Sequence, residues 1–369
     1  ENQHVAISEE NAIDVCMAEQ YSISAYYYNY YSTKKATQVG AMLILSIEKI
    51  ALPAVSSSLF SAEYVYGSVA EDETTVSALT KIQFKNIDTT KVIGMGRMFY
   101  GCKLLTHLDL TLFDTKNVIN MSEMFFKCNS LQELDLSHFN TSKVTQFYYM
   151  FRECYNLEKL DISKFDTSNT KGVLGFSCMF YDCRKLKSLD LSSFDTSSVE
   201  SMSFMFLRCQ SLTTIDVSHF DTSKVTNMAY MFFGCINVEK FNLKNFDTSN
   251  ATNMGYMFYY CDKLETVDLS SFDTSKVTKM HRMFQGSTKL RNIYVGNGWT
   301  VENLTNTEYK DDSTGGMVVG DTAMFAGCTA LFDAAESKNG VRITVSDKTY
   351  AYAGYNTSLG KYGYLLFKS

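Results

Sequence analysis

The sequence predicts an α/β solenoid, a stack of 26-residue coils that each contain a strand, a turn and a helix. One column of cysteines recurs at this period, with every interval 26 residues except one of 29. Its members are Cys102, Cys128, Cys154, Cys183, Cys209, Cys235 and Cys261. A column of phenylalanines runs in phase with it, at Phe113, Phe139, Phe165, Phe194, Phe220, Phe246 and Phe272. A fixed period of this length indicates stacked coils, because one coil cannot bury its apolar face alone.

Each coil combines two hydrophobic periods. In the coil at 212–235, apolar and polar residues alternate around 215–217, which predicts a short strand with one buried face. From Val225 the apolar residues follow the spacing of one side of a helix. They are Met228, Met231, Phe232 and Cys235. We therefore expect a parallel sheet on one side of the stack, with helices covering the other and the methionines in the core between them.

An aspartate column should cap these helices. Its carboxylates lie just before each helix, where they can accept hydrogen bonds from the first N–H groups. The members are Asp88, Asp114, Asp166, Asp195, Asp221, Asp247 and Asp273, with Asn140 in phase.

The repeat predicts about nine strands. They are centred near Gln83, Asp109, Asp135, Asp161, Asp190, Asp216, Asn242, Asp268 and Tyr294. Three extra residues predict a bulge within 169–176. An insertion between about 303 and 320 predicts an exposed loop, after which Met324 and Cys328 resume the pattern.

The solenoid is expected to span 79–331, between an N-terminal cap at 1–78 and a C-terminal cap at 332–369. Both end segments lack the repeat, and solenoids need atypical ends to cover their first and last coils. Within the caps, 7–19 is compatible with either helix or strand. Short strands are predicted at 26–31, 39–50, 341–345, 350–352 and 362–367.

The leucines at 131, 134 and 136 form the pattern Leu-x-x-Leu-x-Leu of a leucine-rich repeat, although Phe139 replaces the usual Asn or Cys. The fuller string Leu-Asp-Leu-Ser-x-Phe-Asp-Thr-Ser-x-Val-x-x-Met-x-x-Met-Phe-x-x-Cys resembles the BspA-like leucine-rich repeat surface proteins of bacteria. The resemblance covers roughly 79–331. It implies an extracellular or cell-surface protein that adheres to a host.

Composition limits the classes of partner. The net charge is −6 without clusters of Lys or Arg, which argues against nucleic acid. No apolar run approaches the roughly 20 residues of a membrane helix, so no membrane span is expected. The chain starts at Glu1 without a leader, as expected after removal of a signal peptide or in an expressed fragment.

Metal binding, cofactors and catalysis lack sequence support. The column cysteines lie a coil apart, whereas zinc sites need ligands at short spacing such as Cys-x-x-Cys. We expect buried free thiols, since Ser287 fills the same slot, with Cys178 and Cys183 the pair most open to a disulfide. The five histidines form no cluster, and phosphate loops, Gly-x-Ser-x-Gly elbows and His-Glu-x-x-His helices are absent from the sequence.

The open strand face is the candidate binding surface, because alternation points the residues between the leucines outward. The candidate residues are Asp109, Asp135, Asp161, Asp190, Asp216, Asp268 and Tyr294. Two readings of the aspartates stay open: hydroxyls and N–H groups of adjacent coils hold them, or they form a strip for cationic groups or Ca²⁺. Asn242, between Lys240 and Lys244, interrupts the strip.

We therefore expect a non-enzymatic, bacterial, secreted or cell-surface protein that binds a host or neighbouring-cell protein or glycan. One alternative is a structural protomer that joins end to end in a surface appendage or array. Another is a soluble enzyme or inhibitor. An adhesin should be monomeric, whereas a protomer should form linear assemblies.

Overall fold

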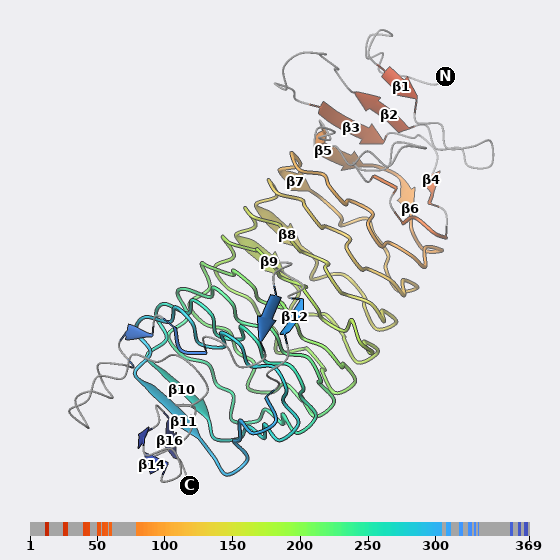
Figure 1. Cartoon of the computed structure of the whole chain (residues 1–369). Coiled ribbons are helices and arrows are strands. Elements are labelled where there is room, and N and C mark those ends of the chain that lie inside the picture. Colours follow the sequence, from red (N-terminus) through yellow and green to blue (C-terminus); the bar gives the residue numbers. More distant parts are fainter. Residues whose placement is uncertain are drawn as a thin grey trace, which may run out of the picture.

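The computed structural model describes residues 79–304 continuously, with shorter segments on both sides. Those segments are 12–14, 25–28, 40–44, 50–52, 54–57, 59–60, 308–310, 317–319, 324–326, 328–329, 331, 355–356, 361–362 and 365–367. The coils lie one on another along a single axis, and the chain advances along this axis from N-terminus to C-terminus (Figure 1).

Short parallel strands line one side of the stack. They are β5 (Leu79–Phe84), β7 (His107–Leu108), β8 (Glu133–Asp135), β9 (Lys159–Asp161), β10 (Thr266–Leu269) and β11 (Asn292–Val295). In their register Asp135 lies opposite Asp161, and Asp268 lies opposite Tyr294. Each of these pairs joins residues 26 apart, so one coil leads directly to the next.

Three of the expected strands do not form. The coils near Asp190, Asp216 and Asn242 contain no strand within the continuously described region. These coils are joined instead through the opposite side of the stack, where for example the Phe206 amide donates to the carbonyl of Met231 at 3.0 Å.

The helix prediction was wrong for the solenoid, because residues 79–304 contain no helix. The amides of Met121, Glu123, Phe125 and Lys127 donate to carbonyls of the next coil at 2.9–3.1 Å. Among the intervening amides, those of Met124 and Phe126 donate three residues back, to Met121 and Glu123, and the Ser122 amide donates to Asn120 Oδ1. A helix requires successive amides to bond four residues back, so this pattern replaces it with a chain of turns.

Each turn chain needs two residues of positive φ, four positions apart. In one coil they are Glu123 at φ 57° and Lys127 at φ 60°, and in another they are Tyr230 at 61° and Gly234 at 68°. Such values are needed at the third residue of a type II turn. The same turn chain recurs in every coil between 97 and 286.

The apolar columns form the core, as the sequence predicts. Met121, Met124 and Cys128 are fully buried, and equivalent residues are buried in the other described coils. One phenylalanine per coil stacks on the next, with centroids 5.5–5.8 Å apart. This column is Phe60, Phe99, Phe125, Phe151, Phe180, Phe206, Phe232, Phe258, Phe284 and Phe325.

The nine described cysteines are buried free thiols, and Cys178 and Cys183 are not paired with each other. Each column thiol hydrogen-bonds the coil before it, as Cys128 Sγ does to the Phe99 carbonyl at 3.2 Å. In the same slot, Ser287 Oγ donates to the Phe258 carbonyl at 2.7 Å. The cysteine column therefore supplies one small buried hydrogen-bond donor per coil and also fills space in the core.

A buried threonine ladder also joins the coils, and the sequence reasoning missed it. Thr141 Oγ1 donates to the carbonyl of Asp166 at 2.9 Å and accepts from the amide of Asp166 at 2.7 Å. The equivalent threonines are at most 2% exposed, so their hydroxyls satisfy backbone groups that water does not reach. They are Thr89, Thr115, Thr141, Thr167, Thr196, Thr222, Thr248 and Thr274.

Strands continue the sheet at both ends. At the N-terminal end, β1 (Ala12–Asp14), β2 (Ala25–Tyr28) and β3 (Gly40–Ile44) extend it in the order β1-β2-β3-β5-β7. A second pair, β4 (Ile50–Ala51) and β6 (Ile87–Asp88), lies nearby. At the C-terminal end, β16 (Leu365–Phe367) pairs in parallel with β11. The division into caps and solenoid stays a prediction, although this pairing is the arrangement that caps require.

The C-terminal insertion is more ordered than the loop that the sequence predicts. It contains an antiparallel pair, β12 (Glu308–Lys310) and β13 (Met317–Val319). The chain then rejoins the columns, because the Phe284 amide donates to the Met324 carbonyl at 3.0 Å. A further pair is β14 (Tyr355–Asn356) with β15 (Lys361–Tyr362). The strands expected at 341–345 and 350–352 lie outside the described residues.

The predicted bulge within 169–176 is present on the turn side. Gly172 and Gly175 have φ of +87° and +36°, and Val173 between them is 70% exposed. No helix among the described residues has the length and apolar character that crossing a membrane requires.

Candidate binding face

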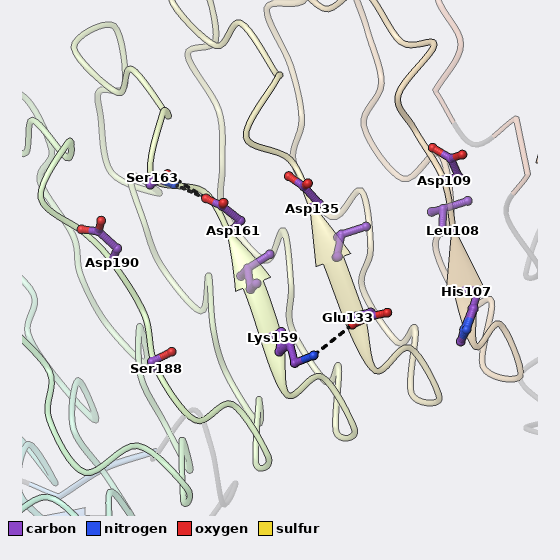
Figure 2. Close-up of a pocket in the computed structure, with 12 residues that line it drawn as sticks. His107, Leu108, Asp109, Glu133, Asp135, Lys159, Asp161, Ser163, Ser188 and Asp190 are labelled. Atoms are coloured by element: carbon purple, nitrogen blue, oxygen red, sulfur yellow. Dashed lines mark hydrogen bonds and ion pairs between the residues drawn. The ribbon is translucent and has the colours of Figure 1, made fainter.

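A shallow groove with a volume of about 730 Å³ runs over β7, β8, β9 and the adjoining coil at 188–190. Asp109, Asp135, Asp161 and Asp190 line it in a row, one carboxylate from each coil (Figure 2). A second row crosses the same coils below them and consists of His107, Glu133, Lys159 and Ser188. The structure thus brings together four of the seven predicted site residues.

Alternation along the short strands positions these side chains. In β8, Leu134 is 3% exposed and packs in the core, whereas Glu133 and Asp135 on either side of it are exposed. The same pattern holds in β9. Because parallel pairing places Asp135 opposite Asp161, the carboxylates of successive coils are aligned in a column.

Each aspartate of the column is held by its own coil. Asp135 Oδ1 accepts a hydrogen bond from the Ser137 amide at 2.9 Å, and Asp109 Oδ1 accepts one from the Thr111 amide at 3.0 Å. The expectation that adjacent coils hold them was therefore wrong, because the residue two places onward turns its own N–H back to the carboxylate. These bonds use Oδ1 and leave the side chains exposed on the face.

The same kind of hydrogen bond favours the charged form of four aspartates of this column. The Ser137 hydroxyl and amide hold the pKa of Asp135 below its usual range. The Ser192 and Ser218 hydroxyls and amides do the same for Asp190 and Asp216, and at Asp109 the Thr111 amide has the largest effect. Hydrogen bonds to the charged form favour it. The groove therefore presents a column of negative charge at neutral pH.

The second row is nearly balanced in charge. Lys159 Nζ lies 3.4 Å from Glu133 Oε2, and both side chains are more than half exposed. Such an exposed pair contributes only about 0–1 kcal/mol to stability. The negative character of the groove thus comes from the aspartate row.

The other three predicted residues lie on the same face beyond the groove. Asp216 is exposed, whereas Asp268 and Tyr294 are half-buried and lie side by side on β10 and β11. Lys240, Asn242 and Lys244 are exposed between them, so the acidic strip is divided as the sequence predicts.

No three His, Cys, Asp or Glu side chains of the described residues are grouped so that they could hold a metal ion.

The second aspartate column closes turns and does not cap helices. Asp221 Oδ1 accepts from the Ser223 amide at 2.9 Å, and Asn140 Oδ1 does the same for Ser142 at 3.1 Å. The local hydrogen bond is the one expected, but the segment that follows is the turn chain described above.

Sequence reasoning overlooked a largely aromatic column on the side opposite the strands. It runs through Tyr100, Phe126, Arg152, Tyr181, Leu207, Phe233 and Tyr259. Its signal was the same 26-residue recurrence that identified the core, but its members include aromatic, aliphatic and charged types.

The repeats match a known family. Residues 71–173, 156–234 and 211–313 match the family described as Mycoplasma protein of unknown function, DUF285. The chain belongs to this family. The three matches together extend over more than half of the chain and include every residue of the groove.

The chain is also similar to a solved leucine-rich repeat protein from Bacteroides ovatus ATCC 8483, with 14% sequence identity. That match covers 74% of this chain and 88% of the other, at a TM-score of 0.23. A search of curated proteins finds no match.

Proposed function

We propose that the chain is a non-enzymatic bacterial protein, secreted or held at the cell surface, that recognises a host or neighbouring-cell protein or glycan through its strand face. In this proposal the coils are leucine-rich repeats of the BspA-like kind. The observation that carries it is the row of four exposed carboxylates along the 730 Å³ groove.

The polar and charged groove residues are free to serve recognition because packing does not need them. Leu134 and Leu160 supply the core contacts of β8 and β9, while their exposed neighbours contribute little to it. The parallel register keeps the carboxylates at a spacing of about 4.8 Å on a backbone held by the coils on both sides. A partner with a complementary basic surface would be steered to such a face, and salt would weaken the interaction.

The test is capture of extracellular-matrix, serum and cell-surface molecules by the immobilised chain. The variant carries Asp135→Asn, Asp161→Asn and Asp190→Asn, which removes three charges and keeps an oxygen that can accept the turn hydrogen bond, as Asn140 does. The matched control carries Asp195→Asn, Asp221→Asn and Asp247→Asn, the same change at the same spacing in the second column.

We expect the strand-face variant to lose partners that the control retains, and the loss to be largest at low salt. Equal capture by both variants would show that the strand face is not the recognition surface.

A further inference from the structure

Most of the large apolar side chains that are exposed in the described part of the chain lie along one corner of the coils. The chain reaches this corner in each coil after the strand and the aspartate turn. Five residues there, here called the apolar ridge, are between 42% and 70% exposed. They are Val55, Ile93 and Ile119 in three successive layers, and Val173 and Leu174 in the bulge. Single exposed apolar residues are normal at a protein surface, but a row of them marks a contact with another surface.

Backbone hydrogen bonds hold the ridge in line with the axis of the stack. The Ile93 amide donates to the Ala54 carbonyl at 2.7 Å, and the Ile119 amide donates to the Ile93 carbonyl at 2.9 Å. The Thr145 amide donates to the Ile119 carbonyl in the same way, at 2.9 Å. The coils follow one axis (Figure 1), so the ridge is straight and, at about 4.8 Å per coil, extends over about 19 Å from Val55 to the bulge.

The bulge makes two apolar side chains project at one end of the ridge. Gly172 has a φ of +87°, and a Cβ atom there would have open space around it. Gly175 has a φ of +36° and lies against the next coil, where a Cβ atom would be 2.8 Å from the Ser201 carbonyl oxygen. Val173 and Leu174 lie between these two glycines and outside the core. Packing within the chain therefore does not explain why the exposed tip of this loop is apolar.

Lysines accompany the ridge in four successive coils. Each is exposed and lies two or three residues before the ridge position, and together they are Lys91, Lys116, Lys143 and Lys171. The residues that follow the ridge position are uncharged, namely Gly94, Asn120 and Gln146. Carboxylates occur further back in these coils, where they accept hydrogen bonds from their own turns, at Asp88, Asp114 and Asp166. The charge nearest to the ridge is therefore positive, although Lys116 is paired with Asp114 at 2.8 Å.

The repeat does not require apolar residues at this corner. In the C-terminal coils the position of Ile93 and Ile119 is occupied by Glu200, Thr226, Thr252 and Thr278. The Thr252 hydroxyl donates to the Thr226 carbonyl of the preceding coil at 3.1 Å, so a polar residue also suits the backbone here. The exposed apolar residues are confined to the coils that also have the row of lysines.

We propose that the apolar ridge binds the surface of an anionic lipid bilayer. The five apolar side chains enter the interfacial layer, and the lysine stems lie along them while the ammonium groups reach lipid phosphates. A straight and rigid row of side chains can touch a planar surface along its whole length. A protein partner would need a groove of the same length, and a ridge one or two side chains wide buries less than the roughly 800 Å² per partner of a stable complex.

This contact does not use the residues of the groove. Asp109 belongs to the ladder of strands, whereas Ile119 lies beside Asn120 in a separate parallel ladder formed after the turn. A chain attached through its ridge would keep the strand face uncovered. The inference therefore goes beyond the proposed recognition function and does not depend on it.

The test is flotation of the whole chain with vesicles of phosphatidylcholine, with and without about 30% phosphatidylglycerol, in about 25 mM and 300 mM salt. We expect the chain to float with the anionic vesicles and to bind neutral vesicles more weakly. Salt should reduce the binding without abolishing it, because burial of the apolar side chains is not screened. Failure to bind the anionic vesicles at low salt, or equal binding to both kinds of vesicle, overturns the proposal.

A ridge variant locates the contact. It carries Ile93→Thr, Ile119→Thr, Val173→Ser and Leu174→Ser, and threonine is the residue that other coils have at the first two positions. We expect vesicle binding to weaken by about tenfold or more, since several apolar side chains no longer leave water. The control carries Leu104→Ser and Leu112→Ser, two exposed leucines away from the ridge, and should bind like the unchanged chain. Normal binding by a ridge variant with an unchanged melting curve contradicts the proposal.

A matched pair of lysine variants tests the charge. Lys143→Gln with Lys171→Gln should weaken binding to anionic vesicles several-fold, because each lysine near the surface contributes to the attraction. Lys224→Gln with Lys276→Gln makes the same change beside the threonines and should have no effect. Each pair loses one bond to an asparagine of the preceding coil, which Lys143 Nζ makes at 2.8 Å and Lys276 Nζ at 2.7 Å. Equal weakening by both pairs would indicate attraction that is not specific to the ridge and would contradict the proposal.

A fluorescent probe distinguishes insertion from contact between copies. With Val173→Trp, the emission should shift to shorter wavelength when anionic vesicles are added, whereas the natural Trp299 of the unchanged chain should show no such shift. Sedimentation velocity without lipid provides the opposite outcome. If the unchanged chain forms dimers that the ridge variant does not form, and the probe shows no shift, then the ridge joins two copies of the chain and the lipid proposal is wrong.

Discussion

Replacing one threonine of the buried ladder tests how the coils are joined. In Thr141→Val the shape is conserved, but the hydroxyl that pairs with both the amide and the carbonyl of Asp166 is lost. Thr141 is only 1% exposed, so water cannot easily take its place. Each unsatisfied buried backbone group costs about 1–3 kcal/mol, and the two together should lower the free energy of unfolding by about 2–6 kcal/mol.

Urea unfolding measures the loss of stability of the whole chain, and hydrogen exchange at the Asp166 amide measures the loss of stability between these two coils. Thr141→Ser should recover most of the stability, because it retains the hydroxyl and loses one methyl group. Thr214→Val, at an exposed position, should change stability by no more than about 0.5 kcal/mol. If Thr141→Val matched Thr214→Val and the Asp166 amide remained protected, the ladder would not be holding the coils together.

Three further results are expected. A thiol reagent should react slowly with the native chain at pH 8, because burial raises the pKa of the column thiols, that of Cys102 to about 12. In denaturant without reductant, nearly all ten cysteines should react with the reagent. Finding eight or more unreactive cysteines in denaturant would indicate disulfides. The free energy of unfolding should fall in acid, because the hydrogen-bonded aspartates have pKa values in the folded chain below the usual value. Their contribution to stability is present above about pH 4 and is lost as the pH falls through the lowered pKa. A series of melting temperatures measured at different pH values checks this prediction. Deleting residues 1–78 should expose the edge of β5 and cause aggregation while distant coils keep their circular dichroism, whereas a soluble monomer with unchanged melting would show that this segment is not a cap.

Much of the core could be predicted from the columns alone. Met121, Met124 and Cys128 recur in phase, and any stack that buries one coil's apolar residues must bury the equivalent ones in the next. The outward direction of Asp135 followed in the same way from its place between two leucines. The groove itself could not be predicted, because it depends on how far side chains from separate coils project.

The sequence by itself therefore determined the period, the buried columns and the face on which the aspartates lie, since these follow from spacing. Only the tertiary structure decided the path of the backbone between the columns. Apolar residues at the spacing of Met121, Met124, Phe125 and Cys128 suit one side of a helix, but they suit a chain of turns equally well. The choice depended on where the amides find acceptors, and the acceptors are carbonyls of the next coil, about 25 residues away along the chain.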